Sequence, residues 1–194
     1  MNGIIYPAIK VYINYRTPLI SLEISGTSSI KSDNIIYSSA TSLLNIAHSG
    51  TGTAILELEH RSSLNVAMSG TGRMILSGRV HGNGRLSVSG TSDLNAISCP
   101  MKLVTVEMSG NAFVRANGLD GVYITMSGAG YFCYRGPLLN SVISGTGSIQ
   151  VCDHQESSFE PPHSSSRSDI HIGKYRQILH AFVAIIFSFF LMLQ

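Results

Sequence analysis

The stretch "MSGTGRMIL", residues 68–76, places a Ser-Gly pair between apolar residues, and the chain repeats this arrangement. Closely similar stretches are "HSGTGTAIL" at 48–56, "VSGTSDLNA" at 88–96 and "ISGTGSIQV" at 143–151. Glycine-rich segments of this kind occur in loops that bind phosphate and at the corners of repeat proteins. The copies at 48, 68 and 88 are 20 residues apart, which favours a repeat because many solenoid units have about this length.

Seven Ser-Gly pairs share one register, and successive glycines are 17 to 24 residues apart. Before each pair, apolar residues alternate with mostly small or polar ones, as in Leu86, Ser87 and Val88. After each pair, a small residue such as Gly72 precedes further apolar positions such as Met74. This period of two is typical of strands with one buried face. The pairs are Ser25 and Gly26, Ser49 and Gly50, Ser69 and Gly70, Ser89 and Gly90, Ser109 and Gly110, Ser127 and Gly128, and Ser144 and Gly145.

The repeat predicts an all-β fold, a single-domain parallel β-helix (solenoid) of about seven coils. One coil cannot bury its own apolar face, so neighbouring coils stack and pair each strand with its copies above and below. Glycine allows a tight corner between two strands, and a serine hydroxyl can bond a neighbouring backbone group there. The Ser-Gly residues are therefore predicted to be structural corner residues.

Composition agrees with a β-rich repeat and excludes other classes. Of the 194 residues, 44% are hydrophobic and 12% are charged, which argues against a charged disordered chain. The formal net charge of +2 gives no electrostatic footprint for nucleic acid. The three cysteines, Cys99, Cys133 and Cys152, form no C-x-x-C motif. Buried free thiols are the expectation for them, with a Cys133–Cys152 bridge as the alternative.

The sequence predicts no catalytic, cofactor-binding or metal-binding residue. No Ser-Gly unit is followed by the lysine that a phosphate-binding loop needs. Asp93 is the only aspartate near an in-register corner, so the repeated ligands of a calcium-binding β-roll are missing. Glu23 and Glu107 share a column but lie about 19 Å apart, too far for the acid/base pair of a glycosidase. His48 occupies an apolar column, where we expect a partly buried, hydrogen-bonded side chain.

The passage "VYITMSGAGYFCYRGPLLNSVISGTGSI", residues 122–149, resembles the head GIN domain family, the head domain of auto-transporter adhesins. In that family a last coil has S-G-x-G, an aromatic residue, Gly and Pro, and then a closing S-G-x-G. The direct junction of Gly and Pro departs from the family, which usually has a residue between them. The resemblance covers roughly residues 8–152 and implies a β-helix-like, non-enzymatic surface module without catalytic residues. The matching residues are Ser127, Gly128, Gly130, Tyr134, Gly136, Pro137, Ser144, Gly145 and Gly147.

The chain divides into three predicted parts. Residues 1–153 form the β-helix repeat domain, whose start, "MNGIIYPAIKVYINYRTPL", reads as a partial first coil rather than a signal peptide. Residues 154–177 are polar and aperiodic, so a flexible linker is expected. Residues 178–194 are strongly apolar, and a helix over Ile178–Leu193 would span about 24 Å, less than the ~30 Å of a bilayer core.

Two interpretations of this hydrophobic C-terminal tail remain open. It is a GPI-attachment signal if small residues such as Ser164, Ser165 and Ser166 provide the lipid attachment site before a polar spacer. It is a tail anchor if Lys174 and Arg176 keep its N-terminal side in the cytoplasm. Either way, the membrane is an expected partner of the tail.

The leading hypothesis is therefore a non-enzymatic cell-surface structural or adhesive module, displayed on a membrane through its tail. Its ligand would be a surface protein or a glycan, which the sequence does not identify, and it would need no cofactor and bind no nucleic acid. The alternative is an intracellular tail-anchored scaffold or polymer, in which the exposed terminal strands of the β-helix stack end to end. A carbohydrate-active β-helix enzyme is the third hypothesis.

Overall fold

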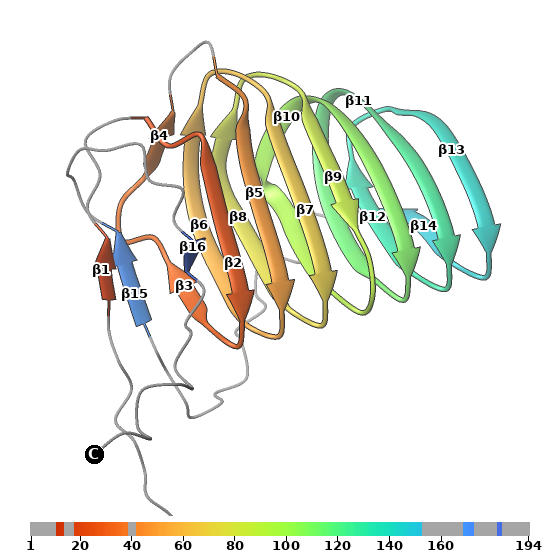
Figure 1. Cartoon of the computed structure of the whole chain (residues 1–194). Coiled ribbons are helices and arrows are strands. Elements are labelled where there is room, and N and C mark those ends of the chain that lie inside the picture. The colour runs from red at the N-terminus through yellow and green to blue at the C-terminus, as the bar shows by residue number, and fades with distance from the viewer. Residues whose placement is uncertain (1–10, 14–17, 39–41, 153–168, 173–181, 184–194) are drawn as a thin grey trace, which may run out of the picture.

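The computed structural model describes residues 11–13, 18–38, 42–152, 169–172 and 182–183, and all statements of structure concern these residues. They form an all-β parallel solenoid of about six turns, as Figure 1 shows. The predicted parallel β-solenoid is confirmed. It has about six turns rather than seven because seven stacked corners are separated by six steps. The predicted C-terminal helix lies outside the described residues, apart from a two-residue strand at Phe182–Val183.

The wound sheet has two faces, which we call the front sheet and the back sheet. Strands of the front sheet end at the Ser-Gly corners. The front sheet contains β2 (Ser21–Gly26), β5 (Leu44–Gly50), β7 (Leu64–Gly70), β9 (Gly84–Val88), the C-terminal parts of β10 (Asp93–Gly110) and β11 (Phe113–Gly128), and β13 (Leu138–Gly145).

Strands of the back sheet begin just after the corners. β10 and β11 run through the opposite turn and belong to both sheets. The short β4 (Ile36–Ser38) pairs with the end of β6. The back sheet contains β3 (Ser29–Lys31), β6 (Thr53–His60), β8 (Arg73–Val80), the N-terminal parts of β10 and β11, β12 (Tyr131–Arg135) and β14 (Ser148–Val151).

All pairings are parallel, and the register follows the repeat residue by residue. Leu22 pairs with Ile46, which pairs with Val66, and each is buried in one continuous core. Burial alternates along the strands, as the period of two predicts. The interior therefore consists of apolar columns that run along the solenoid, and the residues between them face outward.

At the corners, each glycine carbonyl accepts a hydrogen bond from the residue after the next corner glycine. The Thr91 amide donates to the Gly70 carbonyl at 2.9 Å, and the same bond recurs at all six steps with distances of 2.9–3.0 Å. Gly90 has a φ of +81°, which favours glycine, and a Cβ there would lie 2.5 Å from the Gly70 carbonyl oxygen. The corner thus requires glycine both for its conformation and for the close approach of two backbones.

The structure contradicts the expectation that all three cysteines are free thiols. Cys133 and Cys152 form a disulfide, with their Cα atoms 5.2 Å apart, so the expectation of free thiols is wrong for these two. Both lie in a small buried cluster with Ile97, separate from the main core. The bridge links two successive turns and ties the last one to the solenoid. Cys99 is free and buried, as expected.

The two ends of the solenoid differ. β1 (Val11–Ile13) and β15 (Asp169–Ile172) lie side by side at the N-terminal end, where β15 also pairs with β3 and β16 (Phe182–Val183) pairs with β2. β15 falls within the segment for which a flexible linker is predicted, and its four residues are a strand. At the other end, β13 is exposed along its whole length.

His48 is an exception in the core. Its side chain is 1% exposed, and neither ring nitrogen has a hydrogen-bond partner among the described residues. The expectation of a partly buried, hydrogen-bonded histidine is therefore wrong. The ring fits because the next turn carries Gly72, where a Cβ would lie 2.0 Å from the His48 Cε1 atom. Burial lowers the pKa of His48 from 6.5, and an interaction with its own backbone offsets part of this.

A pair of glycine substitutions separates the two demands of the corner. Gly26 has nearly the same φ as Gly90, +78°, but no described atom lies within 4 Å of its Cβ position. We expect Gly26→Ala to cost about 1–2 kcal/mol through its backbone conformation. We expect Gly90→Ala to cost about 2 kcal/mol more, because its Cβ collides with the Gly70 carbonyl. Urea denaturation measures both free energies of unfolding. Equal losses would contradict the close-approach explanation.

The pH dependence of stability tests the burial of His48. The unfolded chain binds a proton near pH 6.5, whereas the folded chain binds it only at lower pH. The free energy of unfolding should therefore be highest above pH 6.5 and should fall as the pH drops toward the lowered pKa. His48→Met, which copies Met68 in the next turn, should fall less steeply between about pH 7 and 5. If both proteins have the same pH slope in denaturation experiments, His48 is not buried as neutral imidazole.

Candidate functional site

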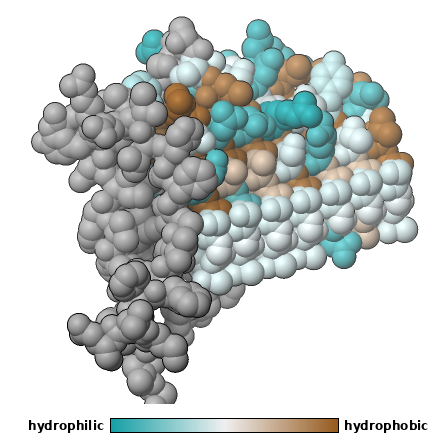
Figure 2. Space-filling view, in the orientation of Figure 1, coloured by the Kyte–Doolittle hydropathy of each residue, from teal (hydrophilic) through white to brown (hydrophobic). Residues whose placement is uncertain are grey.

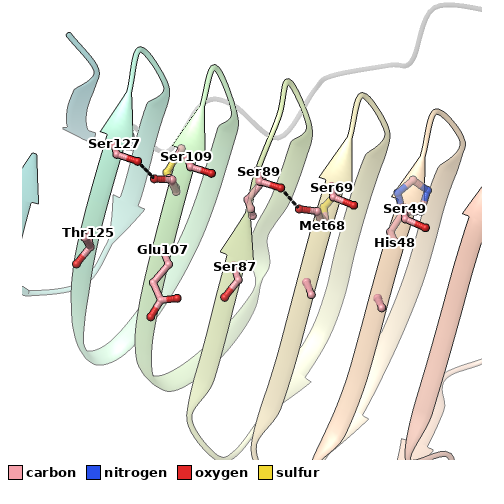
Figure 3. Close-up of a pocket in the computed structure, with 14 residues that line it drawn as sticks. His48, Ser49, Met68, Ser69, Ser87, Ser89, Glu107, Ser109, Thr125 and Ser127 are labelled. Atoms are coloured by element: carbon pink, nitrogen blue, oxygen red, sulfur yellow. Dashed lines mark hydrogen bonds between the residues drawn. The ribbon is translucent and has the colours of Figure 1, made fainter. Parts of the chain in front are cut away.

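The outer face of the front sheet carries a shallow groove with a volume of about 620 Å³. It runs across five successive turns and is lined mainly by two outward columns (Figure 3). Strand register fixes the mid-strand column, because each member pairs with its copy in the next turn. In the corner column, Ser49 pairs with Ser69 and Ser109 pairs with Ser127. The mid-strand column consists of Ala47, Ala67, Ser87, Glu107 and Thr125, and the corner column consists of Ser49, Ser69, Ser89, Ser109 and Ser127.

Serines of the corner column are part of the framework as well as of the surface. The Ser89 hydroxyl donates to the Met68 carbonyl at 3.2 Å, and the Ser127 hydroxyl donates to the Met108 carbonyl at 3.4 Å (Figure 3). Each bond joins one turn to the turn before it. The hydroxyl oxygen keeps its lone pairs, so these serines can still accept a hydrogen bond from outside. Figure 2 shows a pale band, neither hydrophilic nor hydrophobic, along this edge.

One carboxylate lies in the groove, and it is paired. Glu107 contacts the Arg85 guanidinium, with 2.6 Å between Oε1 and Nη2. Glu23 occupies the same column four turns away, as predicted. A glycosidase needs two carboxyl groups within about 10 Å, and the groove contains one.

Asp93 lies on the back sheet between two arginines. Its carboxylate contacts Arg115 at 3.0 Å and Arg73 at 3.4 Å. Guanidinium groups therefore occupy the positions that a cation would need. Within the described residues, no cluster of three or more His, Cys, Asp or Glu side chains is arranged to bind a metal.

Two further buried side chains, His60 and Cys99, are of types that can act in catalysis, but both are enclosed by the fold. The His60 ring is fully buried, and its Nε2 lies 2.9 Å from the Ser63 carbonyl in the turn after β6. Burial, with the negative charge of Glu59, raises the pKa of the Cys99 thiol to about 12. Cys99 is therefore protonated at neutral pH and is a poor nucleophile.

The structure brings the fourteen corner residues into two adjacent ladders along one edge. Ser164, Ser165 and Ser166 lie outside the described residues. The repeat pattern predicts the strands but not the groove, although the residues that form the groove are visible in the pattern. The small and polar residues between the apolar columns, such as Ala67 and Ser87, form its floor. Among the described residues, no helix is long and apolar enough to cross a bilayer.

Comparisons with known proteins agree with this architecture. A solved structure from Parabacteroides distasonis ATCC 8503, described as "Putative lipid binding protein", is similar with a TM-score of 0.64 and 16% sequence identity. The match covers 75% of this chain and 56% of that one, so this chain spans little more than half of its length. At this identity the likeness shows the fold alone. No curated protein matches the chain in sequence.

The family assignment comes from the sequence itself. The model of the family "Putative auto-transporter adhesin, head GIN domain" matches residues 3–137, which include the corners from Gly26 to Gly128. The predicted resemblance is therefore confirmed. On this match, the chain belongs to the head GIN domain family of auto-transporter adhesins.

Proposed function

We propose that this chain is a non-enzymatic cell-surface module that contributes to adhesion, and that the outer face of its front sheet contacts the ligand. The observation that carries the proposal is the groove of about 620 Å³ on that face, which is built from ladders of small side chains. Membership of an adhesin head family supports a surface role.

The chemistry of the groove suits a protein or glycan surface. Serine and threonine hydroxyls offer hydrogen-bond acceptors at each turn, and Ala47 and Ala67 leave apolar gaps between them. Apart from Ser89, the groove residues stand on strands that are paired on both sides, so binding would order few flexible groups. A repeating ligand such as a polysaccharide would meet a corner serine at regular intervals of about 4.8 Å.

We further propose that the apolar segment 178–194 attaches the solenoid to a membrane. As a GPI signal it would be replaced by lipid at a residue such as Ser164 or Ser165, and as a tail anchor it would remain in the chain. Release by a GPI-specific phospholipase supports the first form, and a full-length product that resists the enzyme supports the second. The proposed adhesive role requires the solenoid to be exposed to antibody on intact cells.

Two serine substitutions test the proposed binding face. Ser87 lies in the groove, and Ser77 faces outward on the back sheet. We expect Ser87→Arg to abolish most attachment of cells displaying the full chain, because a long side chain would fill the shallow groove. Ser77→Arg adds the same charge and volume to the opposite face and should leave attachment unchanged. Attachment is counted on panels of immobilised glycans and of glycan-free proteins, which distinguishes the two ligand classes.

Antibody staining of intact cells shows that each variant is displayed at the same level. The binding-face proposal fails if Ser87→Arg and Ser77→Arg attach equally well. It also fails if Ser77→Arg alone loses attachment, which would place the ligand on the back sheet.

A further inference from the structure

The N-terminal end of the solenoid is occupied by β15 and β16, two strands from the C-terminal part of the chain, which we call the tail strands. β15 pairs with β3, and β16 pairs with β2, both in the parallel direction of the solenoid turns. Ile170 stands opposite Ile30 and Val183 opposite Ile24, and these two partners belong to the core. The two strands therefore take the register positions that a preceding turn would take. β1 pairs with the other side of β15 and with no other described strand, so it leaves this edge together with β15.

The C-terminal end offers the complementary edge of the same repeat. β13 and β14 pair with the turn before them, and no described strand pairs with their other side. Val142, Ile143 and Val151 are 53%, 44% and 60% exposed there. Residues 138–152 contain no charged residue and no proline, the features that natural edge strands use against pairing.

A second copy of this chain fits this edge better than a partner of other chemistry. Ser144, Gly145, Thr146 and Gly147 repeat the corner of the earlier turns, so a following turn needs the same corner pattern. In that register Ile24 would follow Ile143, and Ile30 would follow Ile149. The exposed charges on β2 and β3, Glu23 and Lys31, would face Val142 and Gln150 and meet no like charge there.

The tail strands cover only part of the edge that they occupy. β16 pairs with two of the six residues of β2, and β15 pairs with two of the three residues of β3. A second copy could pair β13 and β14 along the whole of both strands. The tail has the advantage of being in the same chain, which gives it a high effective concentration.

We propose that β15 and β16 keep the N-terminal edge of the solenoid closed, and that their withdrawal lets this edge pair with the β13–β14 edge of a second copy. The contact is heterologous, because it joins two different ends, and therefore builds an open filament rather than a closed dimer. A chain cannot satisfy its own two ends, which lie six steps or about 29 Å apart. Membrane insertion of residues 178–194 would withdraw β16, and cleavage at Ser164 or Ser165 would remove both β15 and β16. The switch itself does not depend on the adhesive role.

The test uses the full chain in a non-ionic detergent, with one variant that releases the tail and one that holds it. Ile170→Pro with Val183→Pro removes two backbone donors from the tail strands. Ser29→Cys with Asp169→Cys joins register partners, and the ~4.8 Å between paired strands suits a disulfide. Analytical ultracentrifugation and negative-stain microscopy measure assembly. The proline variant should shift from monomer to filaments as its concentration rises, and the disulfide variant should remain a monomer.

A control on the other end identifies the contact. Val142→Lys with Ile143→Lys, added to the proline variant, should return it to monomer because these substitutions charge the β13 edge. A proline variant that remains monomeric overturns the proposal. Filaments that persist with both lysines also overturn it, because assembly would then use another surface. Neither result bears on attachment through the groove, which the Ser87 variant tests separately.

Discussion

The hydrogen bond from each turn to the carbonyl of the preceding corner glycine is the constraint on which the rest of the structure depends. It brings two backbones so close that the Gly70, Gly90 and Gly110 positions have no room for a Cβ. A corner that returns to the same place at every turn fixes the register of both sheets. The apolar columns inside and the hydroxyl columns outside are consequences of that register.

The same constraint shapes the surfaces available for function. Mostly small residues at the corners and between the apolar columns leave a shallow groove on the outer face of the front sheet, and this groove crosses five turns. Each turn of the stack leaves an edge that a further turn could pair with, so the first and the last turn both present such an edge. One edge is paired with β15 and β16, and at the other edge β13 is exposed and pairs with β11 alone among the described strands. Lateral binding and end-to-end pairing therefore belong to different parts of the molecule.

Much of the fold follows from sequence because its determinants are local and repeated. The columns that contain Leu22 and Met68 follow from the spacing of the Ser-Gly pairs, and the strand register reproduces them. Features that depend on contacts between distant segments could not be predicted in this way. The Cys133–Cys152 bridge depends on both thiols lying on the same outer side of adjacent turns. Likewise, β15 has a polar, aperiodic context, and only pairing with β1 and β3 makes it a strand.

Distances between spin labels along one outward column test the parallel stack most directly. Glu23, Ala47 and Thr125 belong to the mid-strand column, and Cys99 is too deeply buried to react with the label. Double electron–electron resonance should give about 19 Å between backbone positions 47 and 125 and about 24 Å between 23 and 125, with allowance for the label arms. A narrow distribution whose mean grows by one strand spacing is the predicted result. Two broad distributions, or means that do not follow the number of turns, would contradict the stacked solenoid.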